Sequence, residues 1–124
     1  MILADSSIWI DHFRGSNPKM RQLLESEDEE IVTHPFVVAE LALGSLKDRR
    51  KTLAELDLLT HVDVADTFEV RRMVDAHSLY SRGIGLVDAH LLASCLLTTG
   101  TRLWTRDTRL QAVARSLAVD ANLP

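Results

Sequence analysis

Hydrophobic residues in this chain gather into short blocks with two different spacings. Residues 1–4 form an uninterrupted apolar run, which is typical of a strand buried on both faces of a parallel sheet. Directly after it, Trp9, Ile10 and Phe13 recur at helical spacing. The run ends at Asp5, so a carboxylate stands where the first predicted strand turns into the first predicted helix. Ligands of open α/β sheets bind at such strand ends.

The alternation of strand-like and helical blocks continues to the end of the chain. Further strands are predicted at residues 31–33, 61–64 and 101–105. The helices predicted between them cover, in order, residues 18–26, 35–46, 47–59, 67–82, 89–99 and 106–117. Because strands alternate with helices throughout, we expect an α/β fold in which a central parallel β-sheet is flanked by helices on both faces.

Two of these helices carry expectations about individual residues. Asn17 and Pro18 form a typical helix start, with the asparagine as cap and the proline at the first helical position. The helix that begins at Thr67 is expected to end at Gly83 and to place His77 on its partly buried stripe. His77 is therefore interpreted as a structural histidine rather than a ligand.

The overall charge limits how the chain can bind nucleic acid. It has 18 acidic and 14 basic residues, which gives a formal net charge of −4. Such a chain does not bind nucleic acid through a general basic surface. A local site at which metal ions neutralise carboxylates remains compatible with this charge, since two divalent ions would cancel the whole excess.

Size and composition indicate an ordinary globular protein. At 124 residues, of which 46% are hydrophobic, the chain is long enough for one domain with a core of its own. Its one cysteine, Cys95, lies in an apolar run and is expected to be a buried thiol, which fits a reducing compartment. The start of the chain lacks the basic region of a signal peptide, and no apolar stretch is long enough to cross a membrane. We therefore expect a cytoplasmic protein that does not contact membranes.

Glu40 is the least ordinary acidic residue. Its helical neighbours are the apolar or small residues Phe36, Val37, Leu41 and Gly44, so it is expected on or beside the buried stripe of its helix. A buried glutamate needs a partner, which can be an arginine or a metal ion.

Three aspartates also occupy special positions. Asp5 and Asp107 stand at strand-to-helix turns, and Asp88 stands in the first turn of a helix. Each could simply cap its helix. Parallel topology can also bring them, with Glu40, to one edge of the sheet. A cluster with only oxygen ligands is typical of magnesium or manganese rather than zinc.

Four segments carry a resemblance to a known family. They are, in order, ILADSSIWIDHFR, HPFVVAELALG, GIGLVDAHLLAS and LWTRDTRL. They resemble the PIN-domain ribonucleases, and more narrowly the VapC-type toxins of bacterial toxin–antitoxin pairs. The resemblance implies a single PIN-like nuclease domain over residues 1–124. It also implies that Asp5, Glu40, Asp88 and Asp107 are catalytic and bind Mg²⁺ or Mn²⁺.

The resemblance further implies a reaction and its partners. The chain would be a metal-dependent endoribonuclease, the toxin of a type II toxin–antitoxin system, that hydrolyses RNA with a metal-activated water. Ser6 and Thr105 match supporting polar positions. The candidates for positioning RNA are the arginines in or near the motif segments, Arg14, Arg82, Arg106 and Arg109. The implied partners are an RNA substrate, a VapB-type antitoxin and a second copy of the chain in a homodimer.

Two other functions are compatible with an acidic α/β domain. One is a non-catalytic module of the same fold whose acidic pocket binds a basic partner, although such a module has no need for Glu40 on a buried stripe. The other is a phosphatase or receiver-like domain. Such phosphatases normally need a second carboxylate two residues after the first, and here Asp5 is followed by Ser6 and Ser7.

Overall fold

The fold is built on three short parallel strands. The computed structural model describes all 124 residues. Its strands are β1 (Ile2–Ala4), β2 (Ile31–Val32) and β3 (Arg102–Trp104), in the order β2-β1-β3. The central strand β1 is buried along its whole length, as its apolar run predicts. The three strands point the same way, so their carboxyl ends meet at one edge of the sheet.

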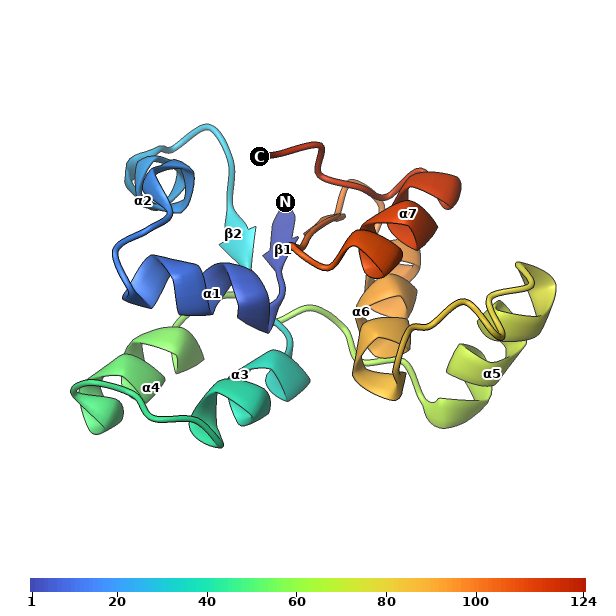
Figure 1. Ribbon diagram of the computed structural model, residues 1–124, viewed down its shortest axis with the longest axis horizontal. Coiled ribbons are helices and arrows are strands. Elements are labelled where there is room, and N and C mark those ends of the chain that lie inside the picture. Colours follow the sequence, from blue (N-terminus) through green and yellow to red (C-terminus); the bar gives the residue numbers. More distant parts are fainter.

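Seven helices surround this sheet. They are α1 (Ser6–Phe13), α2 (Pro18–Glu25), α3 (Pro35–Ala42), α4 (Arg49–Asp57), α5 (Thr67–Ala76), α6 (Leu86–Leu97) and α7 (Thr108–Ser116). Helices α1 to α4 lie on one side of β1 and α5 to α7 on the other (Figure 1). The expectation of a parallel α/β sheet flanked by helices on both faces is confirmed.

Helix α6 is the most buried helix. Every residue from Ala89 to Cys95 is buried, so this helix shows no polar face over two turns. Burial raises the pKa of the Cys95 thiol to about 12, and Cys95 is the inert structural thiol that its apolar surroundings predict. Because the middle of α6 is buried on all sides, packing fixes the position of the helix and of the first turn that carries Asp88. No helix is both long and apolar enough to span a membrane.

The predicted strand at residues 61–64 is wrong. Only His61 pairs with the sheet region, through a single parallel bridge to Thr33. The carbonyl of Asp63 instead accepts a hydrogen bond of 2.6 Å from the Ser94 hydroxyl of α6. The side chain of a neighbouring helix therefore takes the place of a strand partner.

Helix α3 ends earlier than predicted, at Ala42 rather than near residue 46. The amide of Leu43 donates to the carbonyls of Ala39 and Glu40, which tightens the last turn. The guanidinium of Arg49 then donates to the carbonyls of Ala42 and Gly44. A side chain from the next helix thus satisfies the carbonyls at the end of α3.

Helix α5 also ends earlier than predicted, at Ala76 instead of Gly83. Ser78 adopts a left-handed backbone with φ of 53°, and the amide of Leu79 donates to the carbonyl of Val74 at 2.9 Å. This is a Schellman ending in which serine replaces the usual glycine. The prediction that His77 is partly buried is wrong, because the side chain is exposed at the end of the helix.

Candidate functional site

Asp5 occupies the carboxyl end of β1 and caps α1. It is 7% exposed. One carboxylate oxygen, Oδ1, accepts hydrogen bonds from the Ser7 hydroxyl and from the Ile8 amide, and the other, Oδ2, accepts one from the Thr105 hydroxyl. Burial raises the pKa of Asp5 above its usual value, while these hydrogen bonds oppose that shift. The bonds hold the carboxylate in one orientation at the sheet edge.

Two hydroxyl groups join the turn after β1 to the turn after β3. The Thr105 hydroxyl, which donates to Asp5, also accepts from the Asp107 amide at 3.0 Å. The Ser7 hydroxyl accepts from the Arg106 amide at 3.1 Å. Thr105 was expected to support the site, but Ser7 was not. The signal for Ser7 was its place two residues after Asp5, within reach of that carboxylate.

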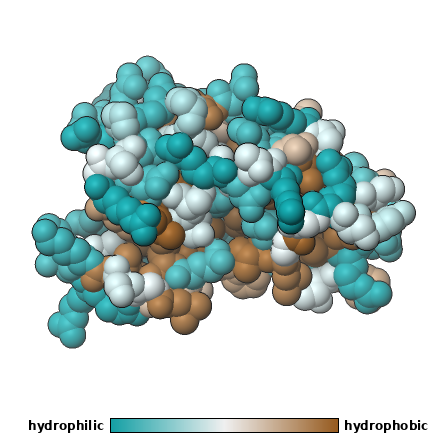
Figure 2. Space-filling view, in the orientation of Figure 1, coloured by the Kyte–Doolittle hydropathy of each residue, from teal (hydrophilic) through white to brown (hydrophobic).

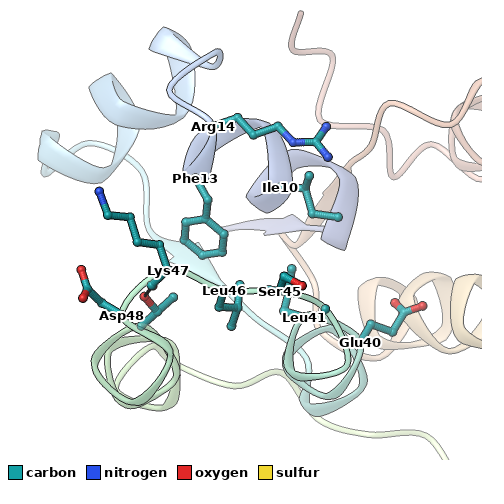
Figure 3. A pocket seen from close by; sticks show the side chains of 11 residues that line it. Ile10, Phe13, Arg14, Glu40, Leu41, Ser45, Leu46, Lys47 and Asp48 are labelled. Atoms are coloured by element: carbon teal, nitrogen blue, oxygen red, sulfur yellow. Dashed lines mark hydrogen bonds between the residues drawn. The ribbon is translucent and has the colours of Figure 1, made fainter.

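Glu40 extends from α3 toward the same carboxylate and toward α6. The Ser6 hydroxyl lies 3.5 Å from its Oε1 and donates to it. Its pKa is raised above the usual value, first by partial burial and then by the negative charges of Asp88 and Asp5. Figure 3 shows the carboxylate pointing out of the neighbouring groove, toward α6. The negative charges of Asp88 and Asp5 therefore lie close enough to Glu40 to disfavour its ionised form.

Glu40 was expected on or beside the buried stripe of its helix, and the structure places it beside that stripe, where the residue is exposed. The short helix α3 presents Val37 and Leu41 to the core and leaves Glu40 at the rim. No arginine or lysine lies within 4.0 Å of its carboxylate, so the alternative of a buried ion pair with arginine does not hold.

The two remaining aspartates act as helix caps in different ways. Asp88, in the first turn of α6, accepts the Gly85 amide at 3.1 Å through Oδ2. Asp107 is exposed, and its Oδ1 accepts the amides of Arg109 and Leu110 at the start of α7. The structure thus brings Asp5, Glu40 and Asp88 together. It links Asp107 to them through Thr105, while the Asp107 carboxylate itself caps a helix.

The four candidate arginines have different surroundings. Arg106 forms an ion pair of 3.2 Å with Asp11, so its charge is already partly matched. Arg14 lines a groove that also reaches Glu40. Arg82 is exposed in the loop before α6, and Arg109 lies against that same loop. None of the four makes an ion pair with the carboxylates of the candidate site.

The donor set fits a hydrated magnesium or manganese ion better than a zinc ion. No three histidine, cysteine, aspartate or glutamate side chains lie close enough to hold one ion directly. Zinc sites need such a compact set, whereas Mg²⁺ keeps several waters and takes one or two carboxylates. The site offers oxygen donors only, and their negative charges have no basic partner within 4.0 Å. A divalent cation with part of its water shell would supply that partner.

Replacing Thr105 with valine should weaken the fold at neutral pH. The change keeps the shape but removes one donor to the Asp5 carboxylate, which should lower the free energy of unfolding by about 1.5–3 kcal/mol in EDTA. The loss should be largest where Asp5 is ionised and should shrink as the pH falls through its raised pKa. Urea unfolding at several pH values measures it, with the exposed Thr60→Val as control. Equal stability at pH 7 would show that the hydroxyl does not support Asp5.

Comparison with known proteins finds matches along almost the whole chain. Residues 2–116 match the family model described as PIN domain. Ribonuclease VapC32 of Mycobacterium tuberculosis (strain ATCC 25618 / H37Rv) is 45% identical over 119 residues, which cover 96% of this chain and 94% of that protein. VapC ribonuclease Mb1587 of Mycobacterium bovis and Ribonuclease VapC11 of M. tuberculosis are each 26% identical over 124 residues, covering 93% of this chain and 92% of theirs.

Proposed function

Because the chain belongs to the PIN-domain family, within its VapC-type ribonucleases, we propose that it is a metal-dependent endoribonuclease and the toxin of a type II toxin–antitoxin pair. The observation that carries this proposal is the set of three carboxylates, Asp5, Glu40 and Asp88, which converge at one sheet edge with no basic partner. The likeness to named ribonucleases over 94% of their length supports RNA as the substrate.

Each carboxylate has a distinct part in this proposal. Asp5 and Asp88 would hold a Mg²⁺ or Mn²⁺ ion, and each is kept in place by donors of its own. Asp107, which is exposed at the turn after β3, would add a further negative charge near the ion. When bound, such an ion lowers the pKa of a coordinated water and withdraws charge from the phosphate that is attacked.

Glu40 is suited to take the proton of the attacking water. Its pKa is raised by its surroundings, and a base with a raised pKa holds a proton more readily than an ordinary glutamate. The Ser6 hydroxyl donates to Oε1 and orients the group, which leaves Oε2 open to accept the proton. The water oxygen would bond to phosphorus while Glu40 Oε2 receives its proton, and the P–O3′ bond would break with its electron pair passing to the 3′-oxygen, which takes a proton from a solvent water.

A groove beside Glu40 suits the antitoxin. It has a volume of about 540 Å³, and its apolar part consists of Ile10 and Phe13 of α1, Leu41 of α3 and Leu46. Figure 3 shows these side chains lining the groove, with Glu40 at one end. An apolar helix or tail of a VapB-type partner would fill it and present a basic side chain to the carboxylates, which would block the site.

Exposed leucines offer a surface for a second copy of the chain. Leu43 and Leu58, at the ends of α3 and α4, are 89% and 85% exposed. Figure 2 shows hydrophobic side chains along the lower edge of a largely hydrophilic surface. Exposed apolar patches of this kind mark protein contacts, which supports a homodimer.

Removal of divalent metal should abolish cleavage of RNA. In EDTA the purified protein should leave RNA intact, and Mg²⁺ or Mn²⁺ in excess should restore cutting, because only oxygen ligands are offered. Gel analysis of total RNA measures this, with Asp88→Asn prepared in parallel to reveal contaminating nucleases. Undiminished cleavage in chelator would contradict metal dependence. RNA that is bound but never cut in any metal would instead favour the non-catalytic module.

A further inference from the structure

The side chain of Arg109 lies directly against the backbone of Gly83. A Cβ atom at position 83 would come within 2.8 Å of Arg109 Cδ and 2.9 Å of its Nη1. Gly83 also has a φ of +78°, a left-handed conformation that glycine adopts without cost. Glycine at this position therefore permits the left-handed turn and also leaves room for the Arg109 side chain.

The guanidinium of Arg109 has no acidic partner. Arg102, Arg106 and Arg115 each pair with a carboxylate, whereas Arg109 forms neither an ion pair nor a side-chain hydrogen bond. Its residue is exposed, and no acceptor in the protein uses any of the five donors of the group. An arginine that is packed on a backbone yet unpaired is available to an anion from solution.

Arg109 is also joined on two sides to the proposed site. Its backbone amide donates to Asp107 Oδ1 at 2.9 Å, and Asp107 is tied to Asp5 through Thr105. The loop on which it rests reaches, two residues after Gly83, the Gly85 amide that holds Asp88. The backbone of Arg109 thus belongs to the turn that carries Asp107, and its side chain rests on the loop whose Gly85 amide holds Asp88, with no ion pair to any of these carboxylates.

From this placement we propose that Arg109, seated on Gly83, binds a backbone phosphate of the RNA next to the one that is cut. A planar guanidinium matches two phosphate oxygens, and its position sets the register of the strand over the carboxylates. Arg109 is a positioning residue here, and the inference rests on the proposed ribonuclease function. Among the four candidate arginines, it is the one whose side chain packs against the backbone of a neighbouring loop and has no acidic partner.

Binding at different salt concentrations tests this directly. The probe is a fluorescein-labelled single-stranded RNA of mixed sequence, bound in Mg²⁺ by proteins that all carry Asp88→Asn so that the RNA stays intact. Arg109→Ala should weaken binding about tenfold, the low end for a hydrogen-bonded charge pair. It should also reduce the slope of log K against log salt by about 0.7, the share of one phosphate. Arg109→Lys should recover the slope but only part of the affinity.

Two comparisons separate positioning from general charge or stability. Arg115→Ala removes a cation from the far end of the same helix, where it pairs with Asp120, and should leave the slope unchanged. Gly83→Ala keeps every charge but displaces the Arg109 side chain, so it should weaken RNA binding. Because both changes disturb the same group, Gly83→Ala should add nothing to Arg109→Ala. Thermal melts check that the left-handed position 83 still folds with alanine.

Cleavage kinetics complete the test. With Asp88 intact, Arg109→Ala should raise KM several-fold more than it lowers kcat, because the arginine holds RNA rather than reacting. If the wild-type protein cleaves RNA but Arg109→Ala leaves the slope of log K against log salt unchanged, the inference is overturned. Wild-type protein that does not cut RNA in Mg²⁺ or Mn²⁺ would instead overturn the proposed function.

Discussion

Asp88→Asn should give a folded protein whose RNA cleavage falls by two orders of magnitude or more. The amide oxygen of asparagine can still accept the Gly85 hydrogen bond, and asparagine caps helices as well as aspartate does. What disappears is one negative charge toward the metal. Changes to groups that merely support a metal ligand cost about 10- to 100-fold, so loss of a ligand charge should cost at least as much.

The measurement is cleavage of RNA by purified wild-type and Asp88→Asn protein in Mg²⁺, with thermal melts of both. Asp66→Asn is the control, since the Asp66 carboxylate accepts the Glu69 amide in the opposite half of the same capping arrangement, at the start of α5, and lies outside the proposed site. It should retain wild-type cleavage. Cleavage near the wild-type rate by Asp88→Asn would mean that Asp88 serves only as part of the helix start.

Glu40→Gln should separate stability from activity. Partial burial and the charges of Asp88 and Asp5 raise the pKa of Glu40, so the folded state disfavours its ionised form. In EDTA at neutral pH the variant should therefore melt at or above the wild-type temperature. It should gain less stability from Mg²⁺ or Mn²⁺, because the gain follows metal affinity. It should not cleave RNA.

The raised pKa of Glu40 also predicts how the stability difference between Glu40→Gln and the wild-type protein changes with pH. A carboxylate with a raised folded pKa stabilises the protein at low pH and loses that contribution as the pH rises through the folded pKa. The advantage of Glu40→Gln should thus be greatest near pH 7 and vanish below the ordinary glutamate pKa of 4.5.

Melts from pH 4 to 7, with EDTA or with metal, test the expected stability changes. Glu55→Gln removes a charge from the exposed surface of α4 and serves as the control. A Glu40→Gln protein that is strongly destabilised in EDTA would refute the placement of Glu40 among repelling carboxylates.

Local features of the sequence determined most of the fold. The apolar run before Asp5 predicted the central buried strand, and Asn17 with Pro18 predicted the start of α2, where the Asn17 side chain accepts the Met20 amide. Such features act within a few residues, through side-chain period and cap hydrogen bonds. The sequence also placed Asp5, Asp88 and Asp107 at helix starts, because those positions follow from the same local rules.

The predicted bounds of secondary structure failed where a side chain from another element bonded the backbone, or where one residue adopted an unusual backbone conformation. Polar and apolar residues alternate over residues 61–64 as in a strand, but the Ser94 hydroxyl donates a hydrogen bond to the Asp63 carbonyl. Helix α3 stops early because Arg49 takes its terminal carbonyls, and α5 stops where Ser78 adopts a left-handed backbone that glycine more often supplies. Propensity is a weak guide wherever tertiary partners compete for the same groups.

Only the tertiary structure decided how the residues of the candidate site contact one another. Helical spacing placed Glu40 on or beside the buried stripe of its helix, and the orientation of α3 leaves it exposed at the rim, where Ser6, 34 residues away in the chain, orients it. The contact between Thr105 and Asp5 spans 100 residues. The contact between the Arg109 side chain and Gly83 likewise joins α7 to the loop before α6. A sequence fixes which groups are available and which local turn each occupies, but their distances depend on how the helices pack across the sheet.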